Sequence, residues 1–326
     1  GFIKRIFDEF MHMPLEIPFA RMTWHEAMER YGSDKPDTRF ALELINITDA
    51  VRDSSFAVFK NAVAEGGSVR AINVPGGASF SRKEIDSLVE YVKTYGARGL
   101  AWYKHAADAV SSSFAKFLTE DELKAITDIT GTGEGDLLLI VAAKNKVVFD
   151  SLGALRCEVA RRMGLIDKTK FNFLWITEFP FFEYNEETQH WDAMHHPFTM
   201  PMDECLQYLD TAPEKVFAKA YDLVLNGTEL SSGSIRITDY ELQQKMFESL
   251  GLTDEEIEAK FGFLVEAYKY GAAPHGGMGI GLDRLAMIMC GADSLRDVTA
   301  FPKVQNASEL MSNCPAAVDK DSLDIL

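Results

Sequence analysis

The stretch of sequence that decides the fold runs from Gly277 to Leu285 and reads GMGIGLDRL. Glycine recurs at every second position, and an arginine follows where a helix is predicted to begin. Side chains of a strand alternate between its faces, so we expect Met278, Ile280 and Leu282 to enter the core. The glycine face would be bare, and a flat ligand could lie against its backbone while Arg284 reaches a polyphosphate. The pattern also fits a glycine-rich core strand followed by an ordinary surface arginine.

Composition bounds the class of protein. The chain has 326 residues, of which 47% are hydrophobic, so it can bury a core of two domains or of one interrupted domain. It holds no apolar run of the roughly 18 residues that a membrane span needs, and its first residues mix both charges. We therefore expect a cytoplasmic protein with no membrane partner. A net charge of −17 disfavours a protein that coats nucleic acid without specificity.

The four cysteines are scattered and form no CxxC pair. This spacing predicts neither a zinc site nor a disulfide framework. We expect reduced thiols that are mostly buried. The residues concerned are Cys157, Cys205, Cys290 and Cys314.

Changes in texture along the chain predict three parts. Residues 1–39 form an N-terminal piece of the core, with a helix beginning after Thr23 and a polar linker at 31–37. Residues 40–150 carry balanced charge and alternate strand and helix patterns, which predicts an inserted α/β domain that folds independently. Residues 151–326 form the C-terminal core.

The third part predicts an α+β fold with a mostly antiparallel sheet flanked by helices. Strand patterns occur at 173–184, 224–229, 234–238 and 277–282. Helical patterns are expected at 213–224, 239–250 and 253–270.

Two histidines precede a proline in His195-His196-Pro197, so at least one imidazole is held on a rigid turn. Neutral imidazoles suit a small anionic ligand. A metal site and a simple surface feature are the alternatives, although no HExxH or HxH spacing favours zinc.

Arg236 alternates with apolar neighbours, so Ile235 and Ile237 are expected to point inward while the arginine points away. An arginine there can fork onto a carboxylate, and Ser231-Ser232-Gly233 just before it would leave space for a ligand. The alternative is an exposed arginine at a strand edge.

Asp222 and Glu229 would lie on opposite faces of one unbroken strand. A bulge at Asn226-Gly227 would restore their parity and bring two carboxylates together as ligands for Mg²⁺. Two acidic residues in so acidic a chain are otherwise expected to be solvated.

Taken together, these residues resemble bacterial-type aspartyl-tRNA synthetases, a family of class II aminoacyl-tRNA synthetases. The glycine strand with Asp283-Arg284 looks like motif 3 of that class. The inserted residues are similar to a domain that the family shares with a glutamyl-tRNA amidotransferase subunit. The supporting stretches are SDKPD at 33–37, VPGGA at 74–78 and YGARGLA at 95–101.

The resemblance implies roles for the candidate residues. Arg284 would contact the ATP γ-phosphate, with Gly281, Leu282 and Asp283 beside the nucleotide. Glu229 would bind ATP and Mg²⁺, and Asp222 would be its metal partner. Arg236 would hold the side-chain carboxylate of aspartate, and His195 would belong to the aspartate pocket. Lysyl-tRNA synthetases would need an acidic residue instead of Arg236, and asparaginyl-tRNA synthetases lack the insert.

The family resemblance also implies a function for a larger parent. The parent would be a homodimeric ligase that uses ATP to activate L-aspartate and transfers it to tRNA-Asp; the sequence leaves open whether tRNA-Asn is also charged. The chain carries no recognisable motif 1, motif 2 or anticodon domain, and Leu155-Arg156-Cys157-Glu158 only mimics motif 2 within a helix. We therefore expect a fragment that is inactive alone. The alternative is a non-catalytic, truncated paralogue that binds RNA or protein.

Overall fold

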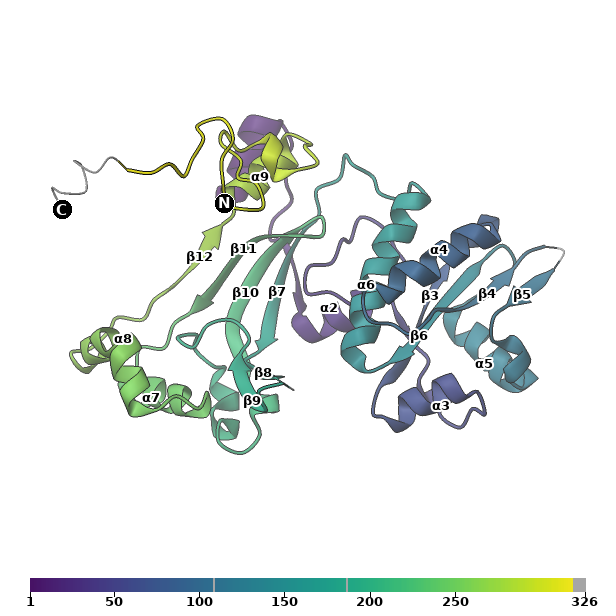
Figure 1. Cartoon of the computed structure of the whole chain (residues 1–326), viewed down its shortest axis with the longest axis horizontal. Helices are drawn as coiled ribbons and strands as arrows, with labels where there is room; N and C mark the ends of the chain where they lie inside the picture. Colours follow the sequence, from purple (N-terminus) through teal and green to yellow (C-terminus); the bar gives the residue numbers. More distant parts are fainter. Residues whose placement is uncertain (108, 186, 319–326) are drawn as a thin grey trace. The chain divides into compact units, whose positions relative to one another are not determined.

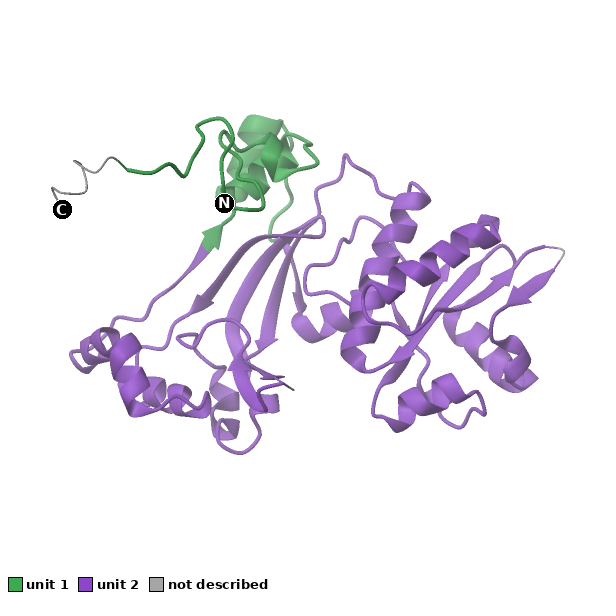
Figure 2. Ribbon diagram, viewed as in Figure 1, with its two compact units in different colours: residues 1–18, 279–326 green, residues 19–278 purple. Residues whose placement is uncertain are grey.

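A computed structural model describes residues 1–107, 109–185 and 187–318. These residues form two compact units, shown in Figure 2. One unit combines residues 1–18 with the described residues from Gly279 onward, and the other spans Phe19–Met278. The larger unit holds two five-stranded sheets, except for the last two residues of one edge strand, and is described first.

The first sheet has the strand order β1-β7-β10-β11-β12 (Figure 1). Its β1–β7 pair is parallel, whereas β10 is antiparallel to both β7 and β11. The sheet is therefore mixed, and the prediction of a mostly antiparallel sheet holds for β7, β10 and β11. The strands are β1 (Ala20–Thr23), β7 (Phe173–Pro180), β10 (Phe217–Leu225), β11 (Thr228–Ile235) and β12 (Gly276–Ile280).

The side chains on one face of this sheet are more deeply buried than those on the other face. In β7, Leu174 and Ile176 are buried, whereas the alternate residues Trp175 and Thr177 are half-buried. The buried face packs against α2 (Trp24–Tyr31) and α7 (Tyr240–Ser249) in one apolar cluster. Thr23 caps α2 by accepting a hydrogen bond from the Glu26 amide, as its sequence predicts.

The second sheet has the order β2-β3-β6-β4-β5, and all of its recorded pairs are antiparallel. It has the predicted mixture of helices and strands, but its strand directions are typical of an α+β rather than an α/β arrangement. The strands are β2 (Ile45–Asn46), β3 (Ser68–Val74), β4 (Ala101–His105), β5 (Val110–Ser112) and β6 (Leu137–Ala143).

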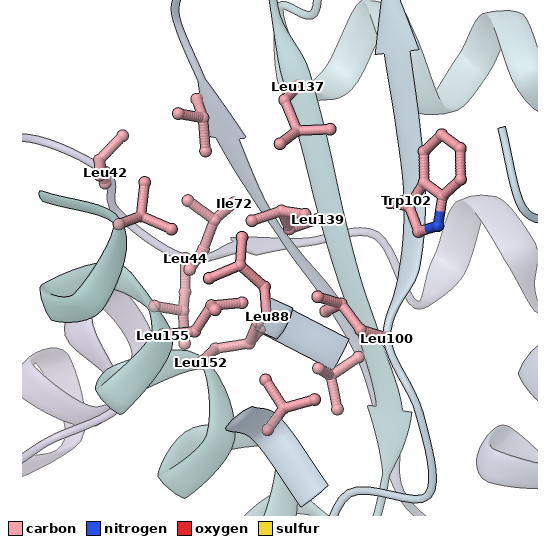
Figure 3. Close-up of a cluster of buried hydrophobic side chains, with 14 of the residues drawn as sticks. Leu42, Leu44, Ile72, Leu88, Leu100, Trp102, Leu137, Leu139, Leu152 and Leu155 are labelled. Carbon is pink, nitrogen blue, oxygen red and sulfur yellow. The ribbon is translucent and has the colours of Figure 1, made fainter. Parts of the chain in front are cut away.

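Both faces of the second sheet are covered by helices. Alternate residues of β6 enter two different clusters: Leu137 and Leu139 pack toward α4 and α6, whereas Leu138 and Ile140 pack toward α3 and α5. Figure 3 shows the first of these clusters. The helices are α3 (Ala57–Ala64), α4 (Arg82–Lys93), α5 (Glu120–Thr130) and α6 (Asn145–Arg162).

Helix α6 crosses residue 150, where the sequence predicts the end of the inserted domain. Leu152, Leu155 and Val159 of its second half belong to the same apolar cluster as β3 and β6. The predicted boundaries of the three parts stay a prediction.

The hairpin β8 (Phe182–Asn185) with β9 (His190–Ala193) and helix α8 (Asp254–Lys269) complete the larger unit. The smaller unit contains α1 (Phe2–Ile6), a short π-helical segment (Phe7–Met11) and α9 (Leu282–Met289). Among the described residues, no helix combines the length and apolar character that crossing a membrane requires.

The helix expected at 213–224 and the burial expected for the cysteines are wrong, and one strand was not predicted. Residues 217–225 form β10 instead of the predicted helix, because their buried residues alternate along most of the run. The parallel strand β1 was not expected, since only four residues form it. Cys290 and Cys314 are exposed, whereas Cys205 is buried and Cys157 is partly buried.

Candidate functional site

The hairpin of β10 and β11 carries both candidate carboxylates. Asn226 (φ 53°) and Gly227 (φ 82°) form its two-residue turn, in which positive φ values at both positions match the twist of the strands. The predicted bulge at this dipeptide is therefore wrong. The register instead shifts between Leu223 and Val224, so that Asp222 pairs with Ser232 and Val224 with Glu229.

Asp222 is the most strongly perturbed group of this hairpin. Its side chain is buried, and its Oδ1 atom has no hydrogen-bond partner among the described residues. The pKa of Asp222 is raised to about 6, chiefly by burial and also by Glu229 and Asp34, while Ser232 and Lys35 act in the opposite direction. A buried carboxylate with an unpaired oxygen, beside a second carboxylate, is suited to bind a cation.

Two carboxylates fit the way in which proteins hold Mg²⁺, because this ion keeps several waters and takes its remaining ligands from substrate phosphates. Within the described ranges, no group of three or more His, Cys, Asp or Glu side chains is arranged to hold a metal ion. The pair is therefore suited to a metal that arrives with a phosphate ligand rather than to a closed structural site.

His195 lies on the loop between β9 and β10, edge-on to Phe179 with ring centroids 4.4 Å apart. Its Nε2 atom is buried and has no partner among the described residues. Burial lowers the pKa of His195, although Asp34 and Glu229 oppose that shift. The imidazole is thus neutral at neutral pH and can offer hydrogen bonds without adding charge.

The histidine loop is fixed against the end of β11. Thr199 forms a bridge with Arg236, and the Ile237 amide donates to the Phe198 carbonyl at 2.9 Å. Gln243 of α7, which is fully buried, donates from Nε2 to the Pro197 carbonyl at 3.0 Å. The proline turn is therefore held by backbone bonds from one side and by an amide side chain from another.

Arg236 follows β11 and is half-buried. Its amide donates to the His275 carbonyl at 3.0 Å, and its Nη1 atom is buried with no partner among the described residues. Burial and the charge of Arg236 both lower the pKa of His196, whereas burial raises the pKa of Tyr268 and Arg236 opposes that shift. Both rings therefore lie close to Arg236. An unpaired buried guanidinium nitrogen is costly unless a ligand completes it.

The surroundings of Arg236 differ from the sequence prediction in two ways. Ile235 is exposed rather than inward-facing, because β11 ends there and the alternation does not continue to the buried Ile237. A Cβ atom on Gly233 would lie 2.8 Å from both Met278 Cβ and the Tyr221 ring. Strand β12 therefore occupies the space beside Gly233 that was predicted for a ligand.

The glycine strand is bare on one side, as its sequence predicts. A Cβ atom added to Gly277 or Gly279 would meet no described atom within 4 Å. Met278 and Leu282, however, are 40% and 73% exposed instead of entering the core. Strand β12 is the last strand of its sheet, and Leu282 is the first residue of α9, so strand alternation does not reach it.

Helix α9 carries the remaining candidates and belongs to the smaller unit. Gly281 is its N-cap, with no side-chain cap, and Asp283 lies in its first turn. Arg284 is exposed on the same turn, as are Leu282 and Asp283. The order of strand, glycine and arginine at a helix start agrees with the sequence prediction.

The larger unit thus brings His195, Asp222 and Glu229 into electrostatic range of one another, with Arg236 on the adjoining loop. Asp34 and Lys35 join them, a pair not predicted as site residues. Their only signal in the sequence is a polar linker, which is usual for any surface turn. Gln243 was also missed, because a single amide within a helical pattern carries no distinctive spacing.

Comparison with known proteins places this site in a family. The family model described as "tRNA synthetases class II (D, K and N)" matches residues 1–305. The chain belongs to this class II tRNA synthetase family. The Asp222–Glu229 hairpin, Arg236 and the strand–arginine segment around Arg284 therefore lie within the matched class II synthetase region.

Curated bacterial ligases are among the proteins that are similar to this chain. An "Aspartate--tRNA ligase" of Ruminiclostridium cellulolyticum is 59% identical over 100% of this chain and 55% of its own length. An "Aspartate--tRNA(Asp/Asn) ligase" of Caldanaerobacter subterraneus subsp. tengcongensis is 55% identical over 98% of this chain and 54% of its own length. The chain spans about half the length of these relatives.

A solved aspartyl tRNA synthetase from Entamoeba histolytica aligns with 48% of this chain and 27% of its own chain, at 24% identity and a TM-score of 0.35. A TM-score this low does not demonstrate a shared fold. Membership of the class II synthetase family therefore depends on the sequence comparisons.

Proposed function

We propose that this chain is part of an aspartate–tRNA ligase, which uses ATP to convert L-aspartate to aspartyl-adenylate and then transfers the aspartyl group to tRNA. The observation that carries the proposal is the half-buried Arg236, whose Nη1 atom lacks a partner next to the histidine loop. The names of the two bacterial relatives support the same reaction.

Recognition of the amino acid is assigned to Arg236 and His195. A guanidinium presents parallel N–H donors that match a carboxylate, so Arg236 would take the side-chain carboxylate of aspartate by a forked contact. His195, which is neutral and has an unpaired Nε2 atom, would complete the pocket without repelling or attracting charge strongly. This pairing favours aspartate over asparagine or lysine.

Recognition of the nucleotide is assigned to Asp222, Glu229 and Arg284. The two carboxylates of the hairpin would hold Mg²⁺, which when bound neutralises charge on the phosphates of ATP. Arg284 would contact the γ-phosphate, and the backbone of Gly281, Leu282 and Asp283 would line the nucleotide beside the bare glycine strand. Catalysis by these residues would consist of positioning and charge neutralisation.

The proposal includes tRNA-Asp as the acceptor and a homodimer as the form of the whole protein. One relative is named for both tRNA-Asp and tRNA-Asn, so charging of tRNA-Asn is a second outcome to be measured. A cytoplasmic location is part of the same proposal.

Pyrophosphate exchange tests the proposed function. A protein of full length that contains this chain is expected to exchange pyrophosphate into ATP with aspartate, and not with asparagine or lysine. Because the chain spans about half of its relatives, the chain alone is expected to show little exchange. Absence of aspartate-dependent exchange in the full-length protein would favour the alternative of a non-catalytic binding module.

A further inference from the structure

Helix α6 holds the linker that follows α2 at two separate places. The first is a close approach of two glycines, Gly32 and Gly153. A Cβ atom on Gly32 would lie 3.0 Å from the Gly153 nitrogen, and a Cβ on Gly153 would overlap the Gly32 carbonyl. Gly32 also has a φ of 64°, which glycine adopts without strain. The backbones of α6 and of the linker therefore touch with no side chain between them.

The second place is Arg156, a fully buried arginine of α6. Its guanidinium donates to the carbonyls of Asp37 at 3.0 Å, Leu42 at 3.1 Å and Ala41 at 3.2 Å, with a longer bond to Phe40 at 3.4 Å. It also lies over the rings of Tyr31 and Phe40. A buried cation that is bound this extensively to one short segment fixes the path of that backbone.

The segment held by Arg156 packs against the Asn226-Gly227 turn of the β10–β11 hairpin, which carries Asp222 and Glu229. A Cβ atom on Gly227 would lie 3.1 Å from the Cβ of Asp37, so only glycine fits between them without movement. Asp37 is itself fixed by a forked ion pair with Arg39, with the shortest contact at 2.7 Å. The turn therefore rests on a buried and doubly anchored residue.

The same turn is tied to the linker from its other side. The side chain of Asn172 donates from Nδ2 to the Thr38 carbonyl at 3.1 Å, and the backbone N–H of Asn172 donates to Asn226 Oδ1 at 2.9 Å. Asn226 in turn donates to the Lys170 carbonyl at 2.8 Å. A continuous set of contacts thus runs from Arg156 through residues 37–38 to the turn that separates Asp222 from Glu229.

We propose that Arg156 is a positioning residue that sets the placement of Asp222 and Glu229 by holding residues 37–42 against the Asn226-Gly227 turn. The proposal rests on the proposed function in one respect only, namely that these two carboxylates bind Mg²⁺ with ATP. Arg156 touches neither the metal nor the substrates in this arrangement. Its short resemblance to motif 2 is therefore incidental, and its role is exerted through the linker.

The chemistry requires a planar guanidinium. Lysine keeps the positive charge but offers a single nitrogen, which cannot reach carbonyls on opposite sides of the same segment. Arg156→Lys should therefore loosen residues 37–42 while leaving a cation in place. Arg161→Lys is the matched control, because Arg161 lies on the same helix and its largely exposed guanidinium forms an ion pair with Glu158.

The first measurement needs no enzymatic activity. Amide hydrogen exchange of this chain is expected to become faster by about tenfold at residues 226–228 in Arg156→Lys, and to stay unchanged there in Arg161→Lys. Gly227→Ala disturbs the same contact from the other end and should accelerate exchange at residues 37–42. If Arg156→Lys does not fold, Gly227→Ala still decides: unchanged exchange at residues 37–42 in that variant overturns the proposal.

The second measurement separates positioning from general loss of stability. In the full-length protein, Arg156→Lys is expected to raise the Mg²⁺ concentration needed for half-maximal pyrophosphate exchange by about three- to tenfold, with the KM for aspartate within twofold of the original. Equal changes in both quantities, or an unchanged Mg²⁺ requirement, would overturn the proposal. A full-length protein without any exchange would contradict the proposed function instead, and the amide exchange result would stand by itself.

Discussion

The two sheets of the larger unit bury their strands differently. In the second sheet, neighbouring residues of β6 enter apolar clusters on opposite faces, so the strands are covered on both sides. In the first sheet, β7 buries Phe173, Leu174, Ile176 and Phe179 and leaves its other residues partly or fully exposed. Near its other strands, polar atoms of His195, Asp222, Ser231, Arg236 and Gln243 have no partners in the described chain. The second sheet and its helix α6 hold fewer such atoms, namely Asn73 Oδ1 and Ser151 Oγ, so the first sheet retains more unsatisfied groups that a ligand can complete.

The largest effect on thermal stability is expected when the second sheet is produced without the second half of helix α6. A segment of residues 40–150 ends inside α6 and lacks Leu152, Leu155 and Val159, which belong to the cluster shown in Figure 3. A segment of residues 40–166 keeps them. Burying three such side chains contributes on the order of 5 kcal/mol, so the longer segment should unfold cooperatively at a clearly higher temperature.

Thermal unfolding followed by circular dichroism compares the two segments directly. If residues 40–150 unfold as cooperatively and at the same temperature as residues 40–166, the predicted boundary is correct and α6 adds little. If neither segment folds, the second sheet depends on the rest of the unit, and the contrast between the two sheets is weaker than their burial indicates.

A large but purely functional effect is expected in the first sheet. In a full-length protein, Arg236→Lys should reduce kcat/KM for aspartate on the order of 100-fold, because one nitrogen replaces a forked contact with a carboxylate. The KM for ATP should change little. Steady-state pyrophosphate exchange at varied aspartate and ATP gives both numbers, and an equal loss for both substrates would show that Arg236 is structural.

A smaller effect is expected where α6 meets the linker. Gly153→Ala places a methyl group against the Gly32 carbonyl, and the strain should lower the free energy of unfolding by about 1–3 kcal/mol. Gly99→Ala is the matched control, since an added Cβ there meets no described atom within 4 Å. Chemical denaturation of both variants measures the difference, and equal stabilities would mean that the backbones separate easily.

The smallest effect has the opposite sign. The buried carboxylate of Asp222 lies beside Glu229, and its Oδ1 atom has no partner among the described residues. Asp222→Asn removes this buried charge, so it should stabilise the fold by about 1 kcal/mol. The same change should weaken the binding of Mg²⁺ with ATP. Thermal unfolding without ligands tests the first part; a clear loss of stability would show that Asp222 is a structural residue instead.

Local patterns in the sequence were sufficient for much of the secondary structure. Helices α7 and α8 lie where periodicity and capping residues predict them, because those signals come from neighbours in the chain. Strand β10 was mistaken for a helix, since its alternation is interrupted by the buried run Asp222–Leu225 and its burial depends on β7 and β11.

Some features of the candidate site could likewise be predicted from the sequence, and others could not. The glycine strand, Arg236 and the two carboxylates could be named from residue types and spacing, because glycine, arginine and paired acidic residues have few roles in combination. Only the tertiary structure showed that a hairpin turn brings Asp222 toward Glu229, that Asp34 and Lys35 face them, and that Arg156 holds the linker which carries that pair. These relations join residues far apart in the chain, and long-range contacts leave no periodic signal in a sequence.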